Sequence, residues 1–171
     1  MLNEDNCWIP DLVTPGSLSC EYSTYLDELY NLFKTDFIDS KPMFRGLPVM
    51  IRKHPIEYGK EEAFFHITCK DFQRNRDRSP DFRRAERIKW CRTFIEKYLC
   101  SGYDCTTCDG IKVWDEPHKN TFQTCLLSEE NRYIVILEKR NGYYLLITAY
   151  YIDYDHTLEK KLAKYEAYTL R

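Results

Sequence analysis

The chain has 171 residues, a formal net charge of −2 and a sequence pI near 6.1, and this size suits one domain with its own core. Hydrophobic residues make up 43% of the chain and aromatic residues 15%, which excludes a disordered or fibrous protein. No apolar run approaches the ~20 residues of a membrane span, and the N-terminus lacks the pattern of a secretory signal. We therefore expect the eight cysteines to be reduced in a cytoplasmic protein.

Charge is strongly segregated along the chain. Residues 1–40 carry one basic side chain and eight acidic ones, whereas residues 70–98 carry ten basic and five acidic ones. Residues 99–131 are acidic again, with two basic side chains and six acidic ones. The basic segment interleaves arginines with aromatic residues such as Trp90, and these groups suit phosphate oxygens and unstacked bases. The pattern favours nucleic-acid binding, with a solvated helix face as the alternative.

The first half of the chain predicts one helix and two strands. After a polar arm, apolar residues at helical spacing predict a helix from Thr24 to about Phe37. Prolines and glycines then delimit a short strand over Leu47–Arg52. The next segment, Glu61–Cys69, alternates in character and predicts a second strand, with His66 on its more polar face.

A long helix is predicted from Ser79-Pro80-Asp81 to about Leu99. The start combines a capping hydroxyl, a proline at the first helical position and a carboxylate in the first turn. Its expected core stripe is Ile88, Cys91, Ile95 and Leu99. Arg83, Arg87 and Trp90 are four and three residues apart and share another face. This face can bind RNA; alternatively, Trp90 covers a core edge and the arginines are solvated.

The C-terminal third predicts a β-rich unit that ends in a helix. Short strands are expected at Ile111–Trp114 and Phe122–Leu127. Two longer β-rich runs, Arg132–Lys139 and Tyr143–Ile152, flank an Asn-Gly pair, which is typical of a hairpin with a type I′ turn. A basic helix from Leu158 to about Tyr168 follows.

The two-residue turn also predicts the register of this hairpin. It places Leu137 opposite Leu146 and Val135 opposite Thr148. Because side chains alternate between the faces of a strand, Thr148 and Tyr150 are expected on the same face as Leu146.

The cysteines include one spacing that is common in metal sites. Cys105 and Cys108 form a CxxC pair, with Cys100 before it and Cys125 after it. Four thiolates can hold a structural zinc ion in a tetrahedral set. No second CxxC is present in the sequence, so free loop thiols and a redox pair remain as alternatives.

The sequence contains no phosphate-binding glycine loop, nucleophile elbow or carboxylate-rich metal motif. Metal-independent acid–base catalysis is the remaining route to phosphodiester chemistry. In that reaction the RNA 2′-hydroxyl attacks the adjacent phosphate, a histidine moves protons and cations stabilise the anion. His66, the arginine-rich helix, Thr148 and Tyr150 supply these groups if the fold brings them together. For His66, a packed and hydrogen-bonded role is the alternative.

Four segments occur in an informative order: HI at 66–67, DFRRAERIKW at 81–90, GIKVW at 110–114 and YIVILEKRNGYYLLITAYYID at 133–153. In this succession the chain resembles a phage-borne family of barnase–EndoU–colicin–RelE-like (BECR) nucleases, over about residues 42–168. The resemblance implies an α+β fold with helices packed against a small curved antiparallel sheet. It also implies two parts, an acidic N-terminal arm and helix at 1–41 and a nuclease domain at 42–171.

The resemblance also implies roles for individual residues. His66 matches the early histidine of the family, Thr148 its late-strand hydroxyl, and Arg84 and Arg87 its helix arginines. With Tyr150, these residues form the expected catalytic set. The expected substrate-binding residues are Arg83, Trp90, Lys139 and His156.

We therefore expect a metal-independent endoribonuclease, encoded by a phage or prophage and acting as a toxin in the bacterial cytoplasm. Its expected partners are tRNA or mRNA and an immunity or antitoxin protein, with no membrane and no catalytic cofactor. A structural zinc ion at the four cysteines is the one expected metal. One alternative is a catalytically inert phage module that binds nucleic acid or protein. Another is an interaction domain stapled by zinc at Cys100, Cys105, Cys108 and Cys125.

Overall fold

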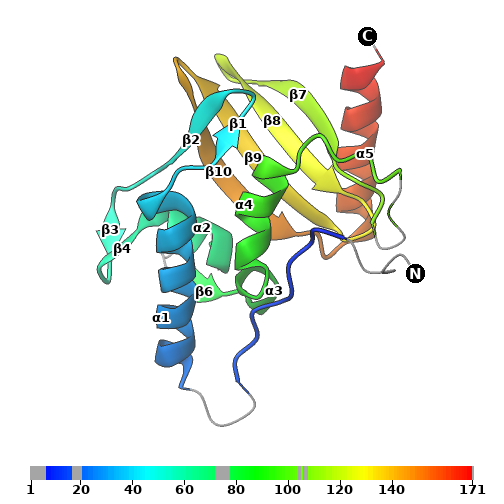
Figure 1. The fold of residues 1–171 in the computed structure, drawn as a ribbon. Helices are drawn as coiled ribbons and strands as arrows, with labels where there is room; N and C mark the ends of the chain where they lie inside the picture. Colours follow the sequence, from blue (N-terminus) through cyan, green and yellow to red (C-terminus); the bar gives the residue numbers. More distant parts are fainter. Residues whose placement is uncertain (1–6, 17–20, 72–77, 104, 106–107, 171) are drawn as a thin grey trace, which may run out of the picture.

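The computed structural model describes residues 7–16, 21–71, 78–103, 105 and 108–170. The described residues form an α+β fold around a curled six-stranded sheet with the strand order β1-β2-β10-β9-β8-β7 (Figure 1). β2 and β10 run parallel, and the other neighbouring strands of this sheet run antiparallel. The predicted class, helices packed on a mostly antiparallel sheet, is confirmed at this level.

Five α-helices and one π-helical segment lie in the described part of the chain. The helices are α1 (Tyr22–Phe33), η1 (Lys34–Asp39), α2 (Glu62–Thr68), α3 (Phe82–Ala85), α4 (Ile88–Glu96) and α5 (Asp155–Thr169). The strands of the main sheet are β1 (Met43–Phe44), β2 (Leu47–Ile51), β7 (Lys112–His118), β8 (Thr121–Ser128), β9 (Tyr133–Arg140) and β10 (Tyr143–Tyr151). Two small ribbons are β3 (Ile56–Glu57) with β4 (Lys60–Glu61), and β5 (Cys69–Asp71) with β6 (Arg78–Pro80).

The sheet is covered by different helices on its two faces (Figure 1). On one face, residues of α1, α2 and α4 share a core with the strands, and Phe33, Phe64 and Val135 belong to it. On the other face, α5 packs against a second core, where the Trp114 and Tyr165 rings meet edge to face at 5.9 Å. The first core contains residues from before and after position 41, for example Phe33 and Phe64. The division of the chain into an arm with a helix at 1–41 and a domain at 42–171 stays a prediction. No helix in the described part is long and apolar enough to cross a bilayer.

Several predicted elements are present. The first predicted helix corresponds to α1 and its π-helical extension, and the Leu47–Arg52 strand corresponds to β2. The strands predicted at Ile111–Trp114 and Phe122–Leu127 correspond to β7 and β8, and both are longer than predicted. The hairpin and the terminal helix are also confirmed as β9, β10 and α5.

The strand predicted over Glu61–Cys69 is wrong, because most of this segment forms helix α2. Its buried residues are Ala63, Phe64, Phe65, Ile67 and Thr68. Phe64 and Thr68 are four residues apart, as are Ala63 and Ile67, so helical spacing describes the buried set better than alternation does. Phe64 is fully buried against α1, whereas strand alternation would have placed it on the polar face.

The long helix predicted after Ser79-Pro80-Asp81 is also corrected. Pro80 ends strand β6, and the capping group is the Asp81 carboxylate, which accepts from the backbone N–H groups of Arg83 and Arg84. The helix is then interrupted between α3 and α4. Leu99 lies beyond α4 and is 81% exposed, so it does not belong to the predicted core stripe.

The hairpin register is confirmed up to Leu146, which pairs with Leu137, and shifts by one residue beyond it. Thr148 therefore pairs with Ile136, and Val135 pairs with Ala149. The prediction that Val135 faces Thr148 is wrong, because a β-bulge adds one residue to β10. The bulge turns Thr148 to the sheet face of Ile136, opposite to that of Leu146.

Candidate functional site

His66 lies one helical turn after Glu62 in α2, and their side chains meet. His66 Nε2 is 3.3 Å from Glu62 Oε1, and Arg52 Nε is 3.9 Å from the other carboxylate oxygen. The His66 side chain is 27% exposed and that of Glu62 is 15% exposed. The imidazole is thus oriented by a mostly buried carboxylate while solvent can still reach it. Sequence reasoning missed Glu62 and Arg52, and the four-residue spacing of Glu62 and His66 is the signal a helical interpretation would have used.

The backbone of His66 is held by two of the residues singled out from the sequence. His66 lies in the last turn of α2, where carbonyl groups lack partners within the helix. Its carbonyl oxygen accepts from Arg84 Nη1 at 3.0 Å and from Thr148 Oγ1 at 3.2 Å. Residues from α2, α3 and β10, far apart in the sequence, therefore meet at one point of the fold.

The Arg84 side chain is fixed on several sides. Its Nε lies 3.3 Å from Asp81 Oδ2, and its guanidinium lies over the Tyr150 ring at 5.1 Å. Burial raises the pKa of Tyr150 above its ordinary value. Tyr150 therefore stays protonated at neutral pH and supports Arg84 with its aromatic face.

Arg83 and Arg87 lie together, as their spacing predicted, with both guanidinium groups over the Tyr151 ring. The distances to the ring centre are 4.8 Å for Arg83 and 4.6 Å for Arg87. Arg83 also pairs with Asp153 at 3.3 Å, and Arg87 pairs with Glu86 and donates to the Arg83 carbonyl at 2.9 Å. Both arginines are therefore paired with a carboxylate, and their contacts with Tyr151 fix the α3–α4 junction against β10.

Trp90 is not placed to stack on a base, and its predicted binding role is corrected. Its side chain is 6% exposed, and its indole N–H donates to the Pro10 carbonyl at 2.8 Å. The ring meets Tyr133 edge to face and stacks on Phe94. Trp90 therefore belongs to the core beneath the N-terminal arm, as the alternative reading of the sequence allowed.

Lys139 and His156 lie in other parts of the fold. Lys139 is near the turn of the β9–β10 hairpin, opposite Tyr144, whereas Thr148 lies beyond the bulge. It lines a pocket of about 250 Å³ together with Arg45 and Phe122. His156 is exposed in the first turn of α5, and its ring stacks on Tyr154 at 5.6 Å.

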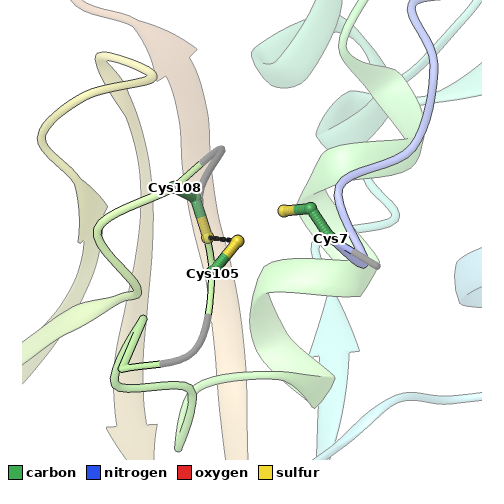
Figure 2. Close-up of side chains that lie close together, drawn as sticks. All are labelled: Cys7, Cys105 and Cys108. Carbon is green, nitrogen blue, oxygen red and sulfur yellow. Dashed lines mark hydrogen bonds between the residues drawn. The ribbon is translucent and has the colours of Figure 1, made fainter. Parts of the chain in front are cut away.

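The structure gathers three cysteines, and the set differs from the one predicted. The sulfur atoms of Cys7, Cys105 and Cys108 all lie within 4.8 Å of one another (Figure 2). Among the described residues, Cys100 and Cys125 do not join such a group, and Cys125 is fully buried in the core under α5. Burial raises the pKa of the Cys108 thiol to about 12. The Cys7–Cys105–Cys108 cluster could hold a metal ion.

Comparison with known proteins found no relative of this chain. The chain matches no family model, no curated protein and no solved structure. The fold class follows from the structure itself, and the assignment to BECR nucleases stays a prediction.

Proposed function

We propose that the protein is a metal-independent endoribonuclease with its reactive site at His66. The observation that carries the proposal is the partly exposed imidazole, paired with Glu62 and held through its backbone by Arg84 and Thr148. A histidine oriented by a carboxylate is a common arrangement for moving protons in a reaction. The resemblance of the sequence to BECR nucleases supports RNA as the substrate.

In the proposed reaction, His66 acts first as base and then as acid. The imidazole accepts the proton of a 2′-hydroxyl, and the 2′-oxygen attacks the adjacent phosphorus. The bond from phosphorus to the 5′-oxygen breaks, and the imidazolium returns its proton to that oxygen. The products are a 2′,3′-cyclic phosphate and a 5′-hydroxyl. Glu62 stabilises the imidazolium between the two proton transfers.

Arg52 is the cation best placed to contact the reacting phosphate. Its side chain is 49% exposed, and its Nε is 3.9 Å from Glu62, which itself contacts His66. A guanidinium can donate to two phosphate oxygens and stabilise the charge that develops on them. Arg84 and Thr148 act through His66 as positioning residues, while Arg87 and Tyr150 hold the elements that carry them.

The biological setting in this proposal rests on the resemblance alone. It comprises a phage or prophage toxin that cleaves tRNA or mRNA in the cytoplasm of a bacterial host and is restrained by an immunity or antitoxin protein.

A second candidate function is a binding module without chemistry, and the pairing of the basic side chains favours it. Lys70 lies 3.2 Å from Asp153 and 3.4 Å from Asp81, and Arg83 shares Asp153. Cations that are already paired contribute less to the capture of a polyanion. This pairing favours a protein as the ligand of such a module, which would leave RNA intact.

The two candidates are separated by incubating the full chain with an end-labelled RNA in EDTA. We expect cleavage fragments with 2′,3′-cyclic phosphate ends. The matched control is a DNA of the same sequence, which lacks the attacking 2′-hydroxyl and should stay intact. Intact RNA after incubation would favour the module, and cleavage of both nucleic acids would refute the proposed chemistry.

A further inference from the structure

The three sulfur atoms of the cysteine cluster have a spacing that suits a single metal ion. Cys105 Sγ and Cys108 Sγ are 3.3 Å apart, and all three sulfurs, with that of Cys7, lie within 4.8 Å of one another. Zinc binds thiolates at about 2.3 Å in a tetrahedral arrangement, which sets sulfur–sulfur distances of about 3.8 Å. The distance between Cys105 Sγ and Cys108 Sγ is within about 0.5 Å of this value. None of the three forms a disulfide, and Figure 2 shows their side chains converging from two separate segments.

The loop that carries Cys105 and Cys108 is closed by its own backbone. Gly102 and Gly110 have φ values of 72° and 79°, and a Cβ on either glycine would lie 2.5 Å from a backbone atom of the facing segment. The Ile111 N–H donates to the Cys100 carbonyl at 2.9 Å beside them. Any residue larger than glycine is therefore excluded at the two positions where the segments before Cys105 and after Cys108 cross.

The third cysteine, Cys7, lies in the N-terminal arm, which packs along α3 and α4. Trp8 meets Phe94 edge to face at 5.3 Å, directly after Cys7 in the chain. Further along the arm, the Pro10 carbonyl accepts from Trp90, and the Val13 N–H donates to the Glu86 carbonyl at 2.8 Å. The position of Cys7 beside the loop is therefore fixed by packing on the fold.

We propose that Cys7, Cys105 and Cys108 bind one zinc ion, which fastens the N-terminal arm to the loop after α4. Thiolates in a tetrahedral arrangement select zinc among the common divalent ions. Three thiolates leave one coordination position for a solvent molecule. The metal stabilises the arm over Trp90 and takes no part in the reaction at His66. Zinc binding can therefore be tested independently of RNA cleavage.

The test is metal binding by the reduced full chain. We expect one zinc ion per chain by elemental analysis, and Co²⁺ substituted for zinc should give the visible absorption bands of a tetrahedral thiolate site. Loss of a residue that only contacts a metal ligand weakens metal binding by up to about a hundredfold. Cys7 is proposed as a direct ligand, so Cys7→Ser should weaken zinc binding by more than about a hundredfold. Cys100→Ser is the matched control and should bind zinc as the wild type does. Equal losses in the two variants would overturn the assignment of Cys7.

Hydrogen exchange gives a second readout on the wild-type chain, which avoids any variant that fails to fold. Removing zinc with a chelator should increase exchange at the amides of residues 8–13, while exchange in the β9–β10 hairpin stays unchanged. Reduced protein that contains no zinc and gives no Co²⁺ bands would overturn the proposal. The same holds if Cys105 and Cys108 form a disulfide in air and bind no metal when reduced, because they would then be a redox pair.

Discussion

Replacing Trp90 by alanine should destabilise the fold, although the sequence alone suggested an RNA-binding role for this residue. The side chain is 6% exposed, packs on Phe94 and Tyr133, and donates a hydrogen bond to Pro10. Truncating a buried aromatic residue to alanine lowers the free energy of unfolding by about 3–5 kcal/mol. Trp90→Phe keeps most of the ring and loses the N–H donor, so we expect a loss of about 1–2 kcal/mol.

Urea unfolding followed by circular dichroism measures both losses. Leu99→Ala is the matched control, because Leu99 is 81% exposed just after α4 and its loss should change stability by no more than about 0.5 kcal/mol. Binding of RNA to folded Trp90→Phe should equal that of the wild type. A Trp90→Ala variant that loses less than about 1 kcal/mol and binds RNA more weakly would refute the buried position of this side chain.

Three further predictions concern stability. Burial raises the pKa of Glu116, but hydrogen bonds from Lys164 and an indole N–H outweigh this and hold it below its ordinary value of 4.5. Since the pKa of Glu116 is lower in the folded state than in the unfolded state, the ionised carboxylate stabilises the fold above about pH 4.5, and this stabilisation is lost as the pH falls through the folded-state pKa. Glu116→Gln should remove this pH dependence of the free energy of unfolding, measured by urea unfolding from pH 3 to 7. Gly110→Ala should lower the thermal midpoint more than Gly142→Ala, because φ is near 80° at both but only Gly110 faces backbone within 4 Å; equal shifts would contradict the close approach. Thr148→Val should lower the free energy of unfolding by about 1 kcal/mol through loss of its bond to the end of α2, while Thr148→Ser, which keeps the hydroxyl, should lose less.

Local sequence patterns predicted the elements whose signals are local. The Asn-Gly turn fixes the start of the hairpin register, so that Leu137 and Leu146 pair as expected. A helical apolar stripe marked α1. These features follow from turn chemistry and from periodicity. The meeting of Arg84 and Thr148 at the His66 carbonyl is a tertiary contact, and the roles assigned to these residues from the sequence stay predictions.

The features that were missed depend on contacts or on patterns that fit two structures. In the segment around His66, alternation and helical spacing both describe the apolar residues, and only packing on α1 selects the helix. The bulge in β10 adds one residue without a clear sequence signal, and it moves Thr148 to the other face. Cys7 joins Cys105 and Cys108 through tertiary packing of the arm, which spacing along the chain does not encode.

The rate at which His66→Gln cleaves one labelled RNA in EDTA tests the central claim most directly. Glutamine keeps a polar side chain of similar size but does not exchange protons, so the account predicts a fall of at least about 10²-fold relative to the wild type. The matched control is His118→Gln, at the end of β7, which should cleave as the wild type does. Circular dichroism should show both variants folded. Cleavage by folded His66→Gln at the wild-type rate would contradict the account.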